Sequence, residues 1–600
     1  MTQPTSMQIE NLHAAYLSGE MTPRDLIEAL IERTRLDPHR VWIHRLSDTV
    51  LRAYAVALAD KDPQTLPLYG IPFAIKDNID LAGAPTTAAC PAFSYQPQRH
   101  AFVVQRLIDA GAIPIGKTNM DQFAAGLNGS RSPYGACLNS VDPRSIAGGS
   151  SSGSAVAVAL GYASFALGTD TAGSGRVPAA FNNIVGHKPT RGWISTTGVV
   201  PACRSLDTIS IFALNAEDAE RVLSLSAAFD AEDPFSRDIE GHGFDFGRAP
   251  QFRMGVPRKT DLQFFGNPET ETLYAAAIKR AEVMGAQCIE VDFSPFLEVA
   301  SLLYDGPWVA ERYAAICDFF ESHTEALLPT TREIIGSGKR WSAADAYLSG
   351  YRLAALKKQC DAIWQSVDVM LTPTAGTIYT VAEMQANPIE LNSKLGYYTN
   401  FMNLLDYAAS AVPAGFQRNG LPFGVTFFAP ANQDGPLLHW AARWQRDLNA
   451  SDDSAVHIRA QAKNINPLPS GQIRVAVCGA HLSGLPLNWQ LSSRDGRLIF
   501  TTTSSPDYKL YALPGGPPYR PGMVRVDQGG ASIEVEVWEL PLSKFGSFVA
   551  GIPAPLGIGM LSLADGTLVQ GFVCEAAATI DAEDITHFGG WRAFLTSESK

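Results

Sequence analysis

Three residues stand where they could support transfer of an acyl group. Ser150 lies in a Gly/Ser-rich loop, Ser174 lies in a second Gly-rich loop, and Lys76 ends an apolar run. A serine hydroxyl is a weak nucleophile, and a neutral lysine can take up its proton through a second hydroxyl. Lys76 would need a pKa lowered from about 10.4 toward 7–8, a bias of about 3–4 kcal/mol against the ammonium form. Desolvation beneath the two loops could supply that bias.

The elements around these residues could bring the two loops side by side. An Ala/Val-rich helix is expected directly after the first loop, and an apolar strand is expected to end near Gly168, where the second loop begins. Earlier in the chain, strand-like runs at 72–75 and 112–115 flank a helical pattern at 103–109. This alternation predicts an α/β domain, and the apolar residues before Lys76 predict that its amine is buried.

The segment 111–118 satisfies the phosphate-loop pattern, but its residues do not suit that role. Such a loop needs successive backbone N–H groups around a phosphate, whereas this segment is an extended apolar run and Pro114 has no N–H. Gly111 also follows a helical pattern instead of a strand. We therefore interpret Gly111 as a helix C-cap.

The segment 149–153 satisfies the nucleophile-elbow pattern of α/β-hydrolases, which would make Ser151 the nucleophile. The residues before it do not read as the buried strand that an elbow requires. Three later histidines could complete a triad only by chance: His187, His323 and His439. This interpretation stays open as a minor alternative.

The two loops and the lysine block together carry a resemblance to a known family. Gly-Gly-Ser-Ser-Ser-Gly-Ser at 148–154, Gly-Thr-Asp-Thr-Ala-Gly-Ser-Gly-Arg at 168–176 and Lys-Asp-Asn at 76–78 follow the order of the amidase signature family. The resemblance implies that Ser174 is the nucleophile, that Ser150 is a bridging serine after a cis peptide bond, and that Lys76 is the base. It also implies an amidase-signature fold, in which helices cover a central mixed sheet, and an enzyme that needs no metal or organic cofactor.

The same resemblance assigns the groups that stabilise negative charge on the substrate oxygen. The backbone N–H groups of Thr171, Ala172 and Gly173, next to Ser174, are the implied oxyanion hole. The family more often has glycine at 172, but the donor is backbone, so alanine should not abolish function. Two charged residues flank this loop, Asp170 and Arg176, and we expect them to brace it.

Further blocks resemble allophanate hydrolases in particular, and the resemblance then spans essentially the whole chain. These blocks lie at 119–135, at 396–415 and at 479–488. Allophanate is small, flat and anionic, and a guanidinium with hydroxyl donors suits its carboxylate. The resemblance places the substrate-contacting Tyr and Arg at Tyr304 and Arg312, with Gly126 and Asn128 near the same site.

Arg312 has a simpler alternative interpretation. It could be a surface arginine paired with Glu311 or Asp305, and Pro307 could kink or begin a helix between Tyr304 and Arg312. Both interpretations remain open at this point. In the favoured one, attack on the terminal amide releases ammonia and leaves N-carboxycarbamate as the first product.

The C-terminal part of the chain has a different pattern. We assign an amidase domain to 1–463, a linker to 464–472 and an α+β domain to 473–600, because prolines interrupt the chain and short alternating strands follow, with a hairpin signal at Asp565-Gly566. The resemblance suggests that this domain promotes decarboxylation of the first product. His481 is the expected proton donor and Glu575 a weaker candidate, although a lone histidine is more often structural.

The composition of the chain argues against two classes of binding partner. The net charge is −13 and no Lys/Arg-rich run occurs, which argues against a protein that binds nucleic acid or an anionic membrane surface. The N-terminus lacks the pattern of a signal peptide and no segment is apolar enough to span a membrane, so we expect a cytoplasmic protein. The eight cysteines and eleven histidines show no local metal-binding spacing, and the cysteines are expected to be reduced.

We expect a small anionic amide as substrate, a homodimer formed through the large domain, and a functional partnership with a biotin-dependent urea carboxylase. Two alternatives remain. The chain could be another amidase of the same family, acting on glutamine or malonamate, or a subunit that releases ammonia for modification of a charged tRNA. It could also be an inactive scaffold, which the presence of Lys76, Ser150 and Ser174 disfavours.

Overall fold

The computed structural model describes residues 6–239, 241–451, 471–526, 528–564 and 566–598. Contacts divide them into two units, one of 6–239 and 252–451 and one of 241–251 and 471–598. The predicted linker at 464–472 lies mostly outside the described residues, and the first strand of the second unit begins at Gln472. The interval 241–251 clusters with the second unit, which no sequence pattern indicated; the Arg497 guanidinium, for example, lies 4.2 Å from the centre of the Phe244 ring.

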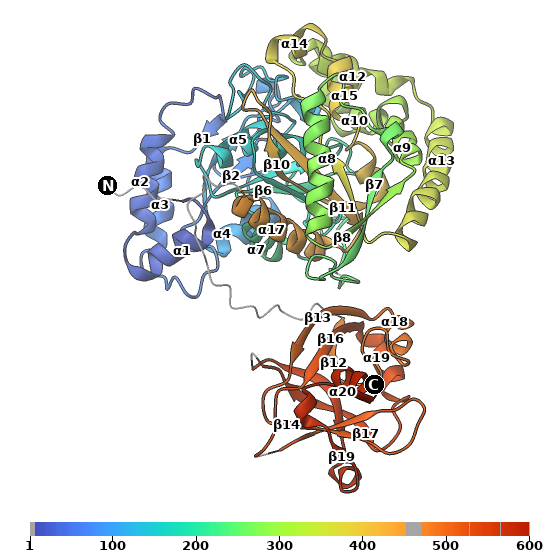
Figure 1. The fold of residues 1–600 in the computed structure, drawn as a ribbon. Helices are drawn as coiled ribbons and strands as arrows, with labels where there is room; N and C mark the ends of the chain where they lie inside the picture. The colour runs from blue at the N-terminus through green and yellow to red at the C-terminus, as the bar shows by residue number, and fades with distance from the viewer. Residues whose placement is uncertain (1–5, 240, 452–470, 527, 565, 599–600) are drawn as a thin grey trace. The chain divides into compact units, whose positions relative to one another are not determined.

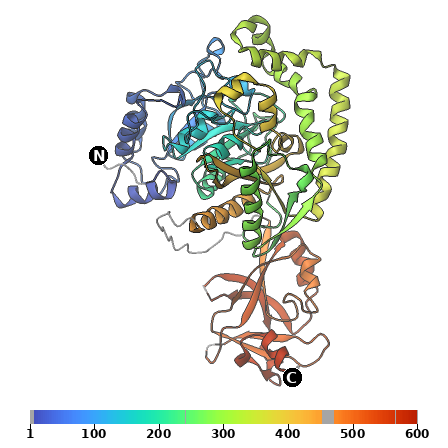
Figure 2. The same ribbon diagram turned by 45° about the horizontal axis from the view of Figure 1, so that its top comes forward.

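The first unit is built on an 11-stranded mixed sheet, which confirms the predicted fold class. The strand order is β1-β3-β2-β4-β6-β5-β10-β11-β9-β7-β8, and helices surround the sheet (Figures 1 and 2). The strands are β1 Trp42–Arg45, β2 Pro72–Lys76, β3 Ile113–Thr118, β4 Phe165–Asp170, β5 Val185–Lys188, β6 Thr208–Ala213, β7 Phe252–Pro257, β8 Ala286–Val291, β9 Val369–Pro373, β10 Tyr407–Phe416 and β11 Pro422–Pro430.

The α-helices of this unit are α1 Ile9–Ser18, α2 Pro23–Arg33, α3 Asp48–Ala57, α4 Phe102–Asp109, α5 Ser152–Ala159, α6 Val177–Phe181, α7 Ala216–Ser226, α8 Pro268–Val283, α9 Ser294–Asp305, α10 Trp308–Ala315, α11 Cys317–Ser322, α12 Pro329–Gly336, α13 Ala343–Asp361, α14 Val381–Ala386, α15 Glu390–Leu395, α16 Phe401–Leu405 and α17 Asp434–Ser451. No helix in the described part of the chain is long and apolar enough to cross a membrane.

Strands β2 and β4 position the two predicted loops. They are parallel neighbours, with Ile75 opposite Leu167, so their carboxyl ends reach the same edge of the sheet. Helix α5 connects the first loop to β4 and packs on both strands. The side chains of α5 are small and are buried along almost the whole helix, which lets the helix approach the sheet closely. Lys76 at the end of β2 therefore lies beside the loop that follows β4.

An aromatic cluster packs helices α9 and α16 against strand β11. Phe296 on α9 packs edge-on against Phe401 on α16, and both rings contact Phe428 on β11. All three are fully buried, and burial of one such side chain contributes roughly 1.5–3 kcal/mol. This packing holds α9, which ends one residue after Tyr304.

The second unit is a smaller α+β body, as predicted. It has a five-stranded sheet in the order β13-β16-β12-β18-β17 and a three-stranded sheet in the order β15-β14-β19. Strands β17 and β18 pair antiparallel, and Asp565 of the hairpin predicted at Asp565-Gly566 lies outside the described residues. The elements are β12 Gln472–Val477, β13 Arg497–Thr503, β14 Tyr508–Ala512, β15 Pro521–Arg525, β16 Glu534–Pro541, β17 Leu556–Ser562, β18 Leu568–Cys574 and β19 Glu583–Asp584, with α18 Trp489–Ser492, α19 Leu542–Val549 and α20 Trp591–Glu598.

Candidate active site

The Lys76 amine is buried among hydroxyl groups. Its Nζ lies 2.7 Å from Ser150 Oγ and 2.7 Å from Thr169 Oγ1, and none of the described carboxylates lies within ion-pair distance of it. Burial lowers the pKa of Lys76 to about 7; Asp121, Asp207 and Asp170 oppose this shift from a distance, and Arg312 adds to it. An uncharged amine beside a serine hydroxyl can act as a proton acceptor near neutral pH. Sequence reasoning missed Thr169, whose only signal was its place at the end of β4.

Ser150 follows the cis peptide bond Gly149–Ser150, as the resemblance implied. Its hydroxyl faces Lys76, and its carbonyl oxygen accepts a hydrogen bond of 3.1 Å from the Asp121 backbone N–H. The side chain is fully buried. Ser150 is therefore fixed on both its backbone and its side chain, in a position to pass a proton to Lys76.

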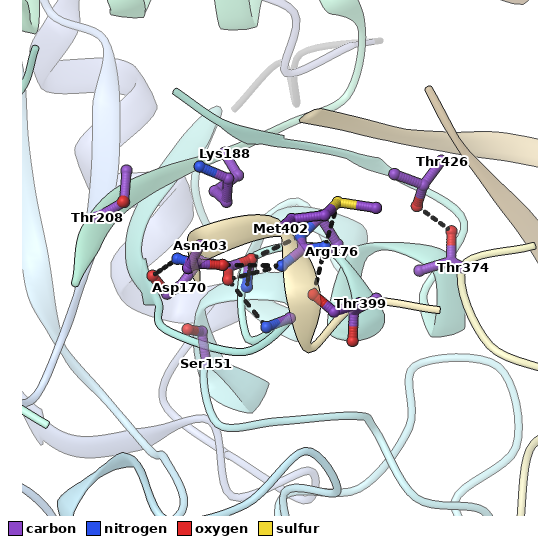
Figure 3. A network of polar contacts seen from close by, with 12 residues as sticks. Ser151, Asp170, Arg176, Lys188, Thr208, Thr374, Thr399, Met402, Asn403 and Thr426 are labelled. Carbon is purple, nitrogen blue, oxygen red and sulfur yellow. Dashed lines mark hydrogen bonds and ion pairs between the residues drawn. The ribbon is translucent and has the colours of Figure 1, made fainter. Parts of the chain in front are cut away.

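A buried ion pair holds the loop that carries Ser174 (Figure 3). Asp170 accepts hydrogen bonds from the backbone N–H groups of Gly173 at 2.8 Å and Gly175 at 2.9 Å, one on each side of Ser174. Arg176 closes the same carboxylate with two hydrogen bonds of 2.9 Å. These contacts are those of the bracing pair that we expected.

The predicted oxyanion donors divide into two groups. Within the described residues, the backbone N–H groups of Thr171, Ala172 and Ser174 have no hydrogen-bond acceptor, so they remain available to a substrate oxygen. Gly173 differs from the prediction, because its N–H already donates to Asp170. The Thr171 hydroxyl donates to the buried Asp207, which fixes the first turn of the loop.

Arg312 is buried, with 3% of its surface exposed. Its Nη1 donates to the Ala124 carbonyl at 3.3 Å, its guanidinium lies 5.7 Å from the centre of the Tyr304 ring, and its Nε has no hydrogen-bond partner in the described part of the chain. Glu311 instead accepts hydrogen bonds from Ser205. Pro307 is the N-cap of α10. The alternative of a surface arginine paired with Glu311 or Asp305 is therefore wrong.

Gly126 and Asn128 lie in a loop held by Asp121, which sequence reasoning missed. Asp121 accepts hydrogen bonds from the backbone N–H groups of Asn128, Gly129 and Arg131. A Cβ atom at Gly126 would lie 2.6 Å from an Asp121 oxygen, so this position needs glycine. The Asn128 side chain donates to Asn392 on α15 and accepts from Ser130 in the loop, so both ends of its amide already have partners.

The elbow interpretation of Ser151 is wrong. Ser151 is the residue before α5 and follows no strand, and its hydroxyl donates to the Thr169 carbonyl at 3.1 Å. His187 bonds to Ser410 and Asp434 instead. The segment 113–118 is strand β3, and Gly111 has a φ of 98° just after α4. This geometry supports the C-cap interpretation and contradicts a phosphate loop.

A separate cavity of about 120 Å³ lies in the second unit. His481, Gln490, Arg520 and Phe572 are among its lining residues. His481 bonds to Gln490 Oε1 at 3.0 Å and stacks on Phe572 at 4.8 Å between ring centres. Burial lowers the pKa of His481, with a smaller contribution from the Arg520 charge.

Arg520 contributes a charge that sequence reasoning missed. Its Nε is buried and has no hydrogen-bond partner among the described residues. Glu575 is exposed and does not line the cavity, so the structure does not bring it together with His481.

Two family models match this chain. The amidase family model matches residues 25–438, and the model of the allophanate hydrolase C-terminal domain matches residues 473–596. Urea amidolyase from Saccharomyces cerevisiae is 42% identical over 591 residues, which cover 95% of this chain and 32% of that protein. The chain thus spans about a third of the length of this relative.

Two more relatives are matched over most of their own length. The crystal structure of Kluyveromyces lactis allophanate hydrolase superposes with a TM-score of 0.82 at 38% identity, over 99% of this chain and 100% of that one. A glutamyl-tRNA(Gln) amidotransferase subunit from Thermosynechococcus vestitus is 31% identical over 73% of this chain and 97% of its own length. Because the amidase model matches more than half of the residues, the chain belongs to the amidase family.

Proposed function

We propose that this chain hydrolyses the terminal amide of allophanate through an acyl-enzyme on Ser174. The observation that carries the proposal is Lys76, an amine buried without a carboxylate partner in the described residues and 2.7 Å from the Ser150 hydroxyl. Similarity over the full length of an allophanate hydrolase structure supports this substrate. Amidotransferase-type relatives match a smaller share of the chain and at lower identity.

The reaction uses the described groups as follows. Ser174 Oγ attacks the terminal carbonyl carbon while its proton passes to Ser150 and the Ser150 proton passes to Lys76. The N–H groups of Thr171 and Ala172 stabilise the negative oxygen of the tetrahedral intermediate. Protonation of the leaving nitrogen by the same relay breaks the C–N bond and releases ammonia. Water then attacks the acyl-enzyme carbonyl and gives its proton to the Ser150–Lys76 relay, and the relay returns a proton to Ser174 Oγ as N-carboxycarbamate leaves.

Arg312 is the proposed clamp for the substrate carboxylate. A buried guanidinium with a donor left over is costly, and an arriving carboxylate offers two acceptors in the matching plane. Tyr304 lies against this guanidinium and supplies the neighbouring hydroxyl. Arg312→Ala should raise the KM for allophanate, and an unchanged KM would exclude the clamp.

Ammonia release from allophanate tests the first step. Lys76→Ala and Ser174→Ala should each lower the rate by about 10³-fold or more, whereas glutamine and malonamate should be poor substrates of the unaltered chain. Labelling of Ser174 by an activated acyl or phosphonate probe identifies the nucleophile. Hydrolysis near the normal rate in Ser174→Ala would exclude this mechanism.

We propose that the cavity of the second unit decarboxylates N-carboxycarbamate. One C–N bond breaks, carbon dioxide leaves, and the nitrogen takes a proton, for which His481 is the donor. The Arg520 guanidinium and the Gln490 amide are suited to hold the remaining carboxylate. In the full-length chain, His481→Gln should lower the rate of carbon dioxide formation relative to ammonia release. An unchanged ratio of the two rates in this variant would remove the assignment.

We also propose a partner enzyme, an oligomeric state and a cellular location for this chain. A biotin-dependent urea carboxylase would supply allophanate, and the longer urea amidolyase relatives support such a partnership. Mixing the chain with a separate urea carboxylase, urea, ATP and bicarbonate should release ammonia. We further propose a cytoplasmic homodimer formed through the large domain, which cell fractionation and light scattering would test.

A further inference from the structure

A second buried arginine lies beside the proposed substrate clamp. Arg131 belongs to the block at 119–135, and 6% of its surface is exposed. Its Nη1 donates to the Ala125 carbonyl at 2.6 Å, its Nη2 donates to the Pro388 carbonyl, and its Nε has no hydrogen-bond partner in the described segments. Like Arg312, it pairs with none of the described carboxylates.

The two guanidiniums act on the same turn of the chain. Arg312 donates to the Ala124 carbonyl and Arg131 to the next carbonyl, that of Ala125. Gly126 follows directly, and a Cβ atom there would lie 3.2 Å from Arg131 Cδ. Ala124 has a positive φ of 54°, a conformation that costs free energy unless surrounding contacts hold it. Arg131 and Arg312 therefore hold neighbouring carbonyl groups of one turn, and Arg131 also lies close to Gly126.

The carboxylates near Arg131 and Arg312 already accept hydrogen bonds from other groups. Arg131 and Arg312 repel each other. Burial lowers the pKa of Arg131, whereas at Arg312 the neighbouring acidic groups outweigh burial and raise the pKa. Asp121 is the charge that most favours the charged form of Arg131, but its oxygens accept three backbone N–H groups. Asp207 likewise accepts the Thr171 hydroxyl and two backbone N–H groups. A buried donor without an acceptor is unfavourable, so a bound carboxylate could accept from the unpaired Nε groups of Arg131 and Arg312 and would compensate the Arg131 charge.

We propose that Arg131 is a specificity-determining residue, which with Arg312 forms a two-guanidinium site that selects small amides carrying a carboxylate over neutral amides. This inference rests on the proposed function, because it assumes an anionic amide as substrate. Arg131 acts by holding the 124–126 turn and by adding a second positive charge. Arg312 remains the group that meets the carboxylate.

The test compares allophanate with biuret, in which a carboxamide replaces the carboxylate. Arg131→Gln should raise the KM for allophanate by roughly 10- to 100-fold, because one charge is lost from the site. The kcat/KM for biuret, or its inhibition constant where turnover is slow, should change by less than about threefold. Arg131→Lys keeps the charge without the planar fork and should show a smaller rise in KM. Arg144→Gln, on an exposed arginine paired with Asp142, is the matched control and should change neither value.

Equal losses for allophanate and biuret in Arg131→Gln would show a merely structural role and overturn the proposal, as would an unchanged KM for allophanate. If Arg131→Gln does not fold, Arg131→Lys decides by the same ratio of the two constants. The double variant with Arg312→Gln should lose less than the product of the two single losses, because both arginines serve one carboxylate. Failure of the proposed function looks different: the unaltered chain would release no ammonia from allophanate.

Discussion

The loop that carries Ser174 and the cavity that contains His481 are held in place by different forces. The loop is fixed by an ion pair, Asp170 with Arg176, in which both side chains are fully buried. The His481 ring is fixed by a hydrogen bond with Gln490 and by the rings of Phe572 and Phe548. Each site should therefore be sensitive to a different kind of substitution. Loss of one charge should disable the loop, whereas the cavity should respond gradually to changes of shape.

The largest effect is expected for Asp170→Asn. The substitution keeps the shape but leaves Arg176 buried without its counter-charge, which costs about 3–5 kcal/mol. Ammonia release should fall by roughly 10³-fold, because Gly173 and Gly175 lose a charged acceptor. Denaturant unfolding and initial rates measure the two effects.

Glu28→Gln is the matched control, because Glu28 pairs with Arg52 on the surface, where both side chains are partly exposed. Such a pair contributes at most about 1 kcal/mol, and the rate should not change. If both variants lost the same stability and the same activity, the ion pair beneath Ser174 would have no special role.

The second prediction concerns pH and should separate the two sites. Lys76 must be neutral to accept a proton, and its pKa is about 7, so ammonia release should rise about tenfold per pH unit below 7 and level off above it. His481 must be protonated to donate, and burial lowers its pKa, so the carbon dioxide step should instead slow as pH rises. Rates of both products between pH 5 and 9 give the test. Parallel profiles would contradict the separate assignments.

The smallest effect is expected for Phe572→Leu. Loss of the stacked ring removes about 0.5–1.5 kcal/mol of aromatic interaction and should slow carbon dioxide formation by about threefold. Ammonia release should stay unchanged, because Ser174 lies in the other unit. If Phe572→Leu lowered the rate of carbon dioxide formation as much as Asp170→Asn lowers ammonia release, the cavity would be as sensitive to substitution as the loop.

The sequence predicted the parts of the site that share one local motif. Ser150, Ser174 and Lys76 were predicted because two Gly/Ser loops and a lysine block occur in order, with an Ala/Val-rich run and an apolar run between the loops. The α+β character of the second unit followed from alternating strands. The burial of Arg312 could not be predicted from the sequence, because burial of this side chain depends on where helix α10 packs.

Other residues left no signal in the sequence. Asp121 acts on three backbone N–H groups, and backbone groups carry no residue type that a pattern could register. Arg520 and Gln490 meet only after distant segments fold into one unit. Thr169 reads as an ordinary strand residue, although its hydroxyl is one of the two that contact Lys76.

The two buried arginines near Tyr304 have a thermodynamic consequence for the whole chain. The Nε groups of Arg131 and Arg312 are buried donors without a partner in the described residues, and a small carboxylate that accepts from them would stabilise the folded chain. By linkage, any such anion that binds the folded chain alone raises its unfolding temperature in proportion to the logarithm of its concentration. The apparent stability of this protein should therefore depend on which carboxylate buffer surrounds it, and the substrate would also act as a folding ligand.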